Sequence, residues 1–100
     1  MTLASVELAE GELKLAGTLD YRTGAQLRRQ GQALVGQVPG NQVLVDCSGV
    51  EKASSVGVSL LLALSRDARA QGKGFKVRAL PQELCQIAEV CGIAGLLERA

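Results

Sequence analysis

The sequence contains no histidine. Histidine is the commonest general base and the commonest metal ligand in proteins, and a Ser-His-Asp triad or a Cys-His pair requires one. A Ser-Lys dyad that uses Lys52 or Lys73 remains conceivable, although lysines beside glycine or in short surface loops are usually solvated. We therefore expect no catalytic residue, no metal site and no enzymatic activity.

Glycine-rich phosphate-binding motifs are missing as well. Gly72-Lys73 is followed by Gly74 rather than by the Ser or Thr of a P-loop, and no G-x-G-x-x-G run occurs. We expect no nucleotide site and no bound cofactor.

Aromatic residues and net charge are both scarce. Tyr21 and Phe75 are the only aromatics, and the net charge is +1. Nucleic-acid binding is therefore disfavoured, because it draws on basic surfaces and on aromatic rings that stack on bases. Since 47% of the residues are hydrophobic, the core must be aliphatic.

Cysteines are few and odd in number. Cys47, Cys85 and Cys91 form no C-x-x-C pair, and an odd count argues against a disulfide framework. All three lie among apolar residues, where a free thiol behaves as a small hydrophobe. Structural thiols are typical of a reducing, cytosolic protein.

No apolar run is long enough to cross a membrane. The longest, Val56 to Leu64, is far shorter than the roughly 20 residues that a spanning helix needs, and Glu7 interrupts the N-terminus before any signal-like apolar segment. We expect a soluble protein without direct membrane insertion, which reaches a membrane only through a partner.

Hydrophobic periodicity predicts one α/β domain over residues 1–100, with a small mixed sheet of about four strands and three to four helices. The expected order is β-β-α-β-α-β-α. The predicted strands are Ser5 to Ala9, Glu12 to Ala16, Val43 to Asp46 and Phe75 to Ala79. The predicted helices begin at an Asp20 N-cap, at Ser55 or Val56, and near Pro81, and a short helical turn is expected at Ile93 to Leu97.

The stretch from Val43 to Leu62 is the most informative part of the chain. It predicts a buried strand, a loop of small polar residues that Asp46 orients, and then an apolar helix. Ser54 and Ser55 fall where the loop becomes the helix. Either serine serves as the N-cap, and with two of them one can cap while the other faces a partner.

Three short motifs resemble those of STAS domains. Gly17-Thr-Leu-Asp20 followed by Thr23-Gly-Ala25 is similar to the family's "G-x-L-D…T-A" stretch. Val45-Asp-Cys-Ser-Gly-Val50 resembles its "D-L-S-G-V" strand end, and Ser54-Ser-Val-Gly-Val58 falls where the family carries "D-S-S-G-L". The resemblance covers nearly the whole chain and implies the STAS fold.

The register of the last motif separates two functions within that family. Without a gap, Ser54 falls on the family aspartate, Ser55 on the first hydroxyl residue and Val56 on the second, where anti-sigma factor antagonists are phosphorylated. MlaB-type members, which resemble "D-T-G-G-L" here, keep only the first hydroxyl, as this chain does. A one-residue gap would place Ser54 and Ser55 on both hydroxyl positions and leaves the phosphorylated antagonist as the alternative.

The MlaB-type resemblance implies a non-catalytic adaptor in a bacterial phospholipid-transport ABC complex of the Mla type, which maintains outer-membrane lipid asymmetry. The implied partner is the complex's cytosolic ATPase subunit (MlaF-like), bound to a permease. The implied location is cytoplasmic, peripheral to the inner membrane through that partner.

Helical spacing suggests where such a partner would bind. Gly57, Leu60, Leu61, Leu64 and Ala68 share the face that should pack on the sheet. Val56, Ser59, Ala63 and Arg66 form a separate strip of mostly small, uncharged residues. The strip is either a surface that another protein's helix can approach closely or an ordinary solvent face that lacks charge. The proposed contact residues are Lys52, Ser54, Ser55, Val56, Ser59, Ala63 and Arg66. The resemblance to the STAS fold adds Asp20, Tyr21 and Arg22, because it implies that the turn before the first helix lies near the serines. This surface predicts that Ala63→Arg or Ser59→Arg abolishes complex formation with little effect on folding.

Overall fold

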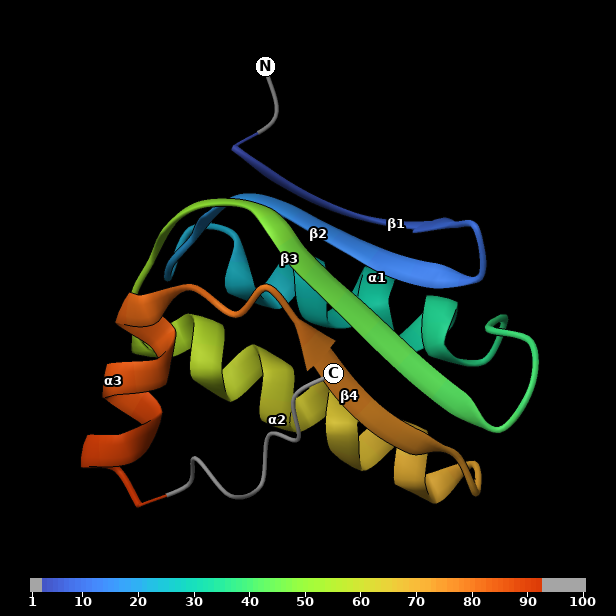
Figure 1. Cartoon of the computed structure of the whole chain (residues 1–100). Coiled ribbons are helices and arrows are strands. Elements are labelled where there is room, and N and C mark those ends of the chain that lie inside the picture. The colour runs from blue at the N-terminus through green and yellow to red at the C-terminus, as the bar shows by residue number, and fades with distance from the viewer. Residues whose placement is uncertain (1–2, 93–100) are drawn as a thin grey trace.

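A computed structural model describes residues 3–92 as a four-stranded sheet and three helices in the order β-β-α-β-α-β-α (Figure 1). This order and the mixed α/β class are as the sequence predicts. The predicted helical turn at Ile93 to Leu97 lies outside the described residues. The elements are β1 (Ala4–Ala9), β2 (Glu12–Leu19), α1 (Gly24–Val35), β3 (Gln42–Ala53), α2 (Ser55–Ala70), β4 (Gly74–Arg78) and α3 (Gln82–Val90).

The strands lie in sequence order across the sheet, β1-β2-β3-β4. Strands β1 and β2 form an antiparallel hairpin, whereas β2 pairs with β3 and β3 with β4 in parallel. The hairpin turns at Glu10 and Gly11, whose φ angles are +55° and +77°. Two consecutive positive φ angles are what a two-residue hairpin turn requires, and the parallel pairs are connected through α1 and α2.

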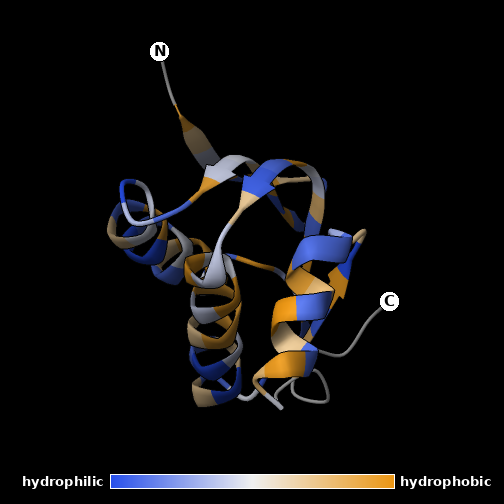
Figure 2. Ribbon diagram, turned by 90° about the vertical axis from the view of Figure 1, so that its left-hand side faces the viewer, coloured by the Kyte–Doolittle hydropathy of each residue, from blue (hydrophilic) through white to orange (hydrophobic). Residues whose placement is uncertain are grey.

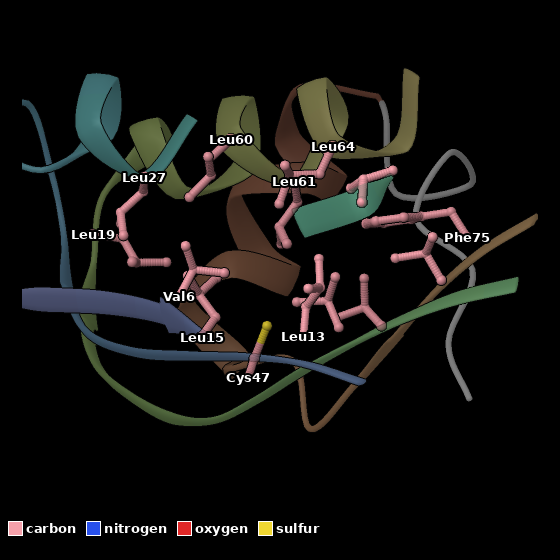
Figure 3. Close-up of a cluster of buried hydrophobic side chains, with 14 of the residues drawn as sticks. Val6, Leu13, Leu15, Leu19, Leu27, Cys47, Leu60, Leu61, Leu64 and Phe75 are labelled. Carbon is pink, nitrogen blue, oxygen red and sulfur yellow. The ribbon is translucent and has the colours of Figure 1, made fainter. Parts of the chain in front are cut away.

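Helices α1 and α2 cover one face of the sheet, and α2 packs against both α1 and α3 (Figures 1 and 2). Alternate side chains of the strands point into this layer, where they meet leucines from the helices (Figure 3). The most deeply buried members are Leu13, Leu15, Leu19, Leu27, Val35, Val43, Val45, Leu61, Leu64, Val77 and Leu84. The core is therefore aliphatic, as predicted.

Cys47 points into this core from β3 (Figure 3) and is almost fully buried. Burial raises the pKa of its thiol to about 12, with a smaller contribution from the neighbouring Asp46 carboxylate. The thiol is thus protonated and packs as a small apolar group, as predicted for this residue.

The prediction of a polar loop after Asp46 is wrong. Strand β3 continues to Ala53, because β2 also continues, to Leu19, and gives the extension a parallel partner. The register shifts along this pair, and the Asp46 carboxylate accepts a hydrogen bond of 2.9 Å from the Ser48 backbone N–H at the irregularity. Asp46 therefore orients the following residues, as expected, but those residues form a bulged strand.

Helix α1 begins later than predicted. Its N-cap is Thr23, and Asp20 instead begins the turn that precedes the helix. The Asp20 carboxylate accepts a 2.8 Å hydrogen bond from the Arg22 N–H, while the Thr23 hydroxyl donates to the Thr18 carbonyl at 2.8 Å. These bonds support an additional turn that the spacing of apolar residues does not reveal.

Lys73 is not solvated, contrary to the expectation for its glycine-rich surroundings. Helix α1 ends at Val35, four residues before Pro39. The Lys73 Nζ donates to the carbonyls of Val35 and Val38 at 3.0 and 2.7 Å. A cation at this position satisfies carbonyls that have no partner within the helix and interacts favourably with the helix dipole.

Candidate functional site

The start of α2 is joined directly to the end of β3. Ser54 is the N-cap, with an extended backbone, and its Oγ accepts a 3.2 Å hydrogen bond from the Val56 N–H. Its own N–H donates to the Leu19 carbonyl at 2.9 Å. Ser54 thus caps α2 and ties it to the end of β2, which is a structural role.

Ser55 is the first residue of α2 and is exposed. Among the described residues its hydroxyl has no hydrogen-bond partner, in contrast to that of Ser54. Ser54 therefore caps the helix, and Ser55 faces solvent.

The turn before α1 lies beside this helix start. Its Asp20 and Arg22 side chains form an ion pair, with 2.7 Å between Arg22 Nη2 and Asp20 Oδ2. This contact holds the pKa of the Asp20 carboxyl below its usual range. Tyr21, between them, is 85% exposed, and it is one of the two aromatic residues of the chain.

A shallow groove of about 390 Å³ lies between the N-terminal halves of α1 and α2. It is nearly uncharged. Its lining residues are Tyr21, Gly24, Ala25, Arg28, Val56, Ser59, Leu60 and Ala63. The structure thereby brings Tyr21 together with three residues of the predicted α2 strip.

The remaining predicted contact residues lie outside this groove. Four of them, Asp20, Arg22, Lys52 and Ser54, line a neighbouring polar hollow of about 590 Å³ together with acidic residues from β3 and α3. Arg66 is exposed on α2, three residues after Ala63, and does not line the groove. Eight of the ten predicted residues thus line two hollows on either side of the turn before α1, and Ser55 and Arg66 line neither.

The α2 strip is partly occupied by the protein's own α1. A Cβ atom on Gly24 would lie only 2.7 Å from Val56 Cγ1, and Ala63 is only 6% exposed. An ion pair joins the two helices, with Arg28 donating to Asp67 at 2.5 and 3.1 Å. The small residues therefore allow α1 and α2 to pack closely against each other. Only the groove that remains between them is open to a partner.

This packing corrects one prediction. Ala63→Arg would place a long charged side chain in a closely packed helix contact, so it would disturb folding as well as binding. Ser59 is exposed, and Ser59→Arg remains a suitable test of the surface.

Sequence reasoning missed the α1 half of the groove. Gly24, Ala25 and Arg28 line it, and only the pairing of α1 with α2 reveals them. The small residues that follow Thr23 are the one local signal, because a helix that starts with Gly and Ala can approach a neighbour closely.

In residues 3–92 no group of three or more His, Cys, Asp or Glu side chains is arranged to hold a metal ion. None of the helices in the same range has the length and apolar character that crossing a bilayer demands. Within the described part, every buried side-chain nitrogen or oxygen has a hydrogen-bond partner.

A family model described as "Mlab, STAS domain" matches residues 3–98. The chain belongs to the STAS domain family. This assignment agrees with the three sequence motifs and with the mixed sheet described above.

Solved structures with the same fold include several anti-sigma factor antagonists. This STAS domain is 18% identical to unphosphorylated SpoIIAA, with a TM-score of 0.71 and coverage of 97% of this chain and 87% of that one. It is 24% identical to an antagonist from Mycobacterium paratuberculosis, with a TM-score of 0.75 and coverage of 96% and 82%. At these identities the likeness shows the fold. A comparison with curated proteins found no significant match.

Proposed function

We propose that this STAS domain is a non-catalytic adaptor that binds the cytosolic ATPase subunit of a phospholipid-transport ABC complex of the Mla type. It would lie in the cytoplasm, at the inner membrane, through that partner and its permease. The observation that carries the proposal is the apolar α1–α2 groove, bordered by the exposed Tyr21. The description of the matching family model, which names Mlab, supports the choice of complex.

Val56 argues against a phosphorylation switch at its own position. It stands where, in the ungapped register, antagonists of the family carry the phosphorylated hydroxyl, and it is half-buried against Gly24. Valine accepts no phosphate, so phosphorylation cannot add charge to the groove at this position. A constitutive contact is what a structural subunit needs, whereas a switch needs a group whose charge changes.

Binding would act on the ATPase through a difference in affinity between its states. An apolar side chain of the ATPase would fill the groove, and the Ser55 hydroxyl and Tyr21 would add polar contacts at its edge. A subunit that binds one arrangement of the ATPase more tightly shifts the population toward it. The adaptor would thereby stabilise that arrangement without any chemistry of its own.

The test compares two alanine-to-arginine variants of the same helix. Ala25 and Ala33 are both exposed on α1, but only Ala25 lines the groove. We expect Ala25→Arg to lose the ABC ATPase during co-purification and Ala33→Arg to retain it, with circular dichroism showing that both fold. Retention by both variants, or the absence of an ABC ATPase from the wild-type complex, would refute the proposal.

An anti-sigma factor antagonist is the second candidate. Its support is the fold shared with SpoIIAA, which has been solved in a phosphorylated form as well, together with the exposed hydroxyl of Ser55. Stoichiometric phosphate on Ser54 or Ser55, removed by a phosphatase and detected by mass spectrometry, would establish this candidate and exclude the adaptor.

A further inference from the structure

Charge is segregated between the α1–α2 layer and the rest of the protein. Residues 20–35 and 55–70, which form this layer and the turn before α1, contain five arginines and two aspartates. The other described residues contain five lysines or arginines and seven acidic residues. A net charge of +1 for the whole chain therefore hides a basic helical face.

Two of the five arginines have an acidic partner. Arg22 pairs with Asp20 and Arg28 with Asp67. Among the described residues the other three, Arg29, Arg66 and Arg69, form no ion pair, and all three are exposed. The positive charge of this face thus resides in side chains that are available to an acidic group.

Arg29 and Arg66 lie one helical turn beyond residues that line the apolar groove. Arg29 lies four residues after Ala25 on α1, and Arg66 lies three residues after Ala63 on α2. Residues three or four apart are neighbours on a helix surface, so each arginine lies one turn from a groove residue. The groove itself carries Arg28 alone, whose charge is offset by Asp67.

We propose that the α1–α2 face binds an acidic segment of its partner protein, with an apolar side chain in the groove and flanking carboxylates on Arg29 and Arg66. Complementary charges around an apolar anchor raise the association rate and select the partner. A protein segment fits better than an anionic membrane, because the groove is a recess that takes up a protruding side chain. The inference rests on the proposed function only in that the partner is a protein.

The test is a selection of displayed random peptides on the full-length protein, with counter-selection on the Ala25→Arg variant. We expect the enriched peptides to share an apolar residue flanked by Asp or Glu. As synthetic fluorescent peptides they should bind at least tenfold more weakly to the Arg29→Glu/Arg66→Glu variant. The Lys76→Glu variant, which reverses a charge on β4 away from both hollows, should bind as the wild type does, and added salt should weaken binding to the wild type.

Several outcomes would overturn the inference. These are enriched peptides without net negative charge, equal binding to both charge-reversed variants, or no enrichment that depends on the groove. Two further results would assign the face to a different occupant. If the Arg29→Glu/Arg66→Glu change abolishes binding to phosphatidylglycerol vesicles, the occupant is a membrane. If the same change abolishes self-association measured by sedimentation, the occupant is a second copy of the protein.

The two proposals can fail separately. If acidic peptides are selected but no ABC ATPase co-purifies, only the proposed function fails. If the ATPase binds the Arg29→Glu/Arg66→Glu variant as tightly as the wild type, only the acidic-segment inference fails.

Discussion

Replacing Asp46 by Asn tests how the sheet positions the start of α2. Asp46 is a buried carboxylate in the middle of β3, with its side chain 9% exposed. One oxygen accepts from the Ser48 N–H at 2.9 Å, and the other accepts from Lys14 Nζ and Arg78 Nη2 at 3.1 and 3.2 Å. The bond to Ser48 holds the irregularity of β3 from which the strand continues toward the Ser54 cap.

The expected loss of stability is about 1–2 kcal/mol. Asparagine has the same shape as aspartate and can still accept a hydrogen bond from the Ser48 N–H. The loss of stability is therefore the difference between a hydrogen bond to a charged acceptor and one to a neutral acceptor. The neutral amide that replaces the second oxygen also lies beside the cations Lys14 and Arg78 and cannot form an ion pair with either. Lys14 and Arg78 are themselves 35% and 43% exposed, so water screens these contacts and they add little.

The pH dependence gives the sharper result. The Ser48 N–H, helped by the nearby cations, holds the pKa of Asp46 far below the usual value of 3.8. A lowered folded-state pKa stabilises the protein above the unfolded-state value, and this contribution disappears as the pH falls through the folded-state value. The difference in the free energy of unfolding between wild type and Asp46→Asn should therefore be largest at neutral pH and decrease below about pH 4.

Urea unfolding followed by circular dichroism measures this difference. A loss of 1–2 kcal/mol corresponds to a midpoint shift of roughly 0.5–1 M for a protein of this size. Glu7→Gln is the control, since Glu7 is exposed on β1, and it should shift the midpoint little. Equal midpoints for Asp46→Asn and wild type, or a difference that stays constant down to about pH 2, would refute the reasoning.

Three further changes should alter stability in the same assay. Ser54→Ala should cost about 1 kcal/mol by removing the α2 cap, and Ser54→Asp should restore most of it; equal stability of all three would contradict the cap. Lys73→Met should cost about 1 kcal/mol by freeing two carbonyls at the end of α1, and an unchanged midpoint would contradict that role. Gly31→Ala should destabilise by about 1 kcal/mol despite better helix propensity, because its Cβ would lie 2.6 Å from Leu64 Cδ2; a stabilised variant would show that α1 and α2 can separate freely.

The element order was predictable because it depends on local patterns. Period-two alternation marks β1 and β2, and the helical spacing of leucines marks α2. The length of β3 was not predictable, because its last residues are small or polar and become a strand only through pairing with β2. That pairing brings the backbones so close that a Cβ on Gly49 would lie 2.9 Å from Ala16 Cβ.

The candidate site was half predictable for a similar reason. The spacing of Val56, Ser59 and Ala63 identifies one side of α2, and the motif resemblance adds Tyr21. Nothing in the local pattern reveals that α1 packs on that side. The sequence therefore does not predict Gly24 and Ala25 as groove residues, and its prediction that Ala63 is open to a partner is wrong. Contacts between helices arise from tertiary packing, which a single sequence does not state.

Hydrogen exchange of the complex tests the docking surface most directly. The protein would be compared alone and bound to the ABC ATPase, with exchange followed by mass spectrometry. We predict new protection in residues 20–29 and 55–66, which contain the groove and its two flanking arginines, and unchanged exchange in β1 and β4. Protection confined to the sheet, with the groove residues exchanging as in the free protein, would contradict the account.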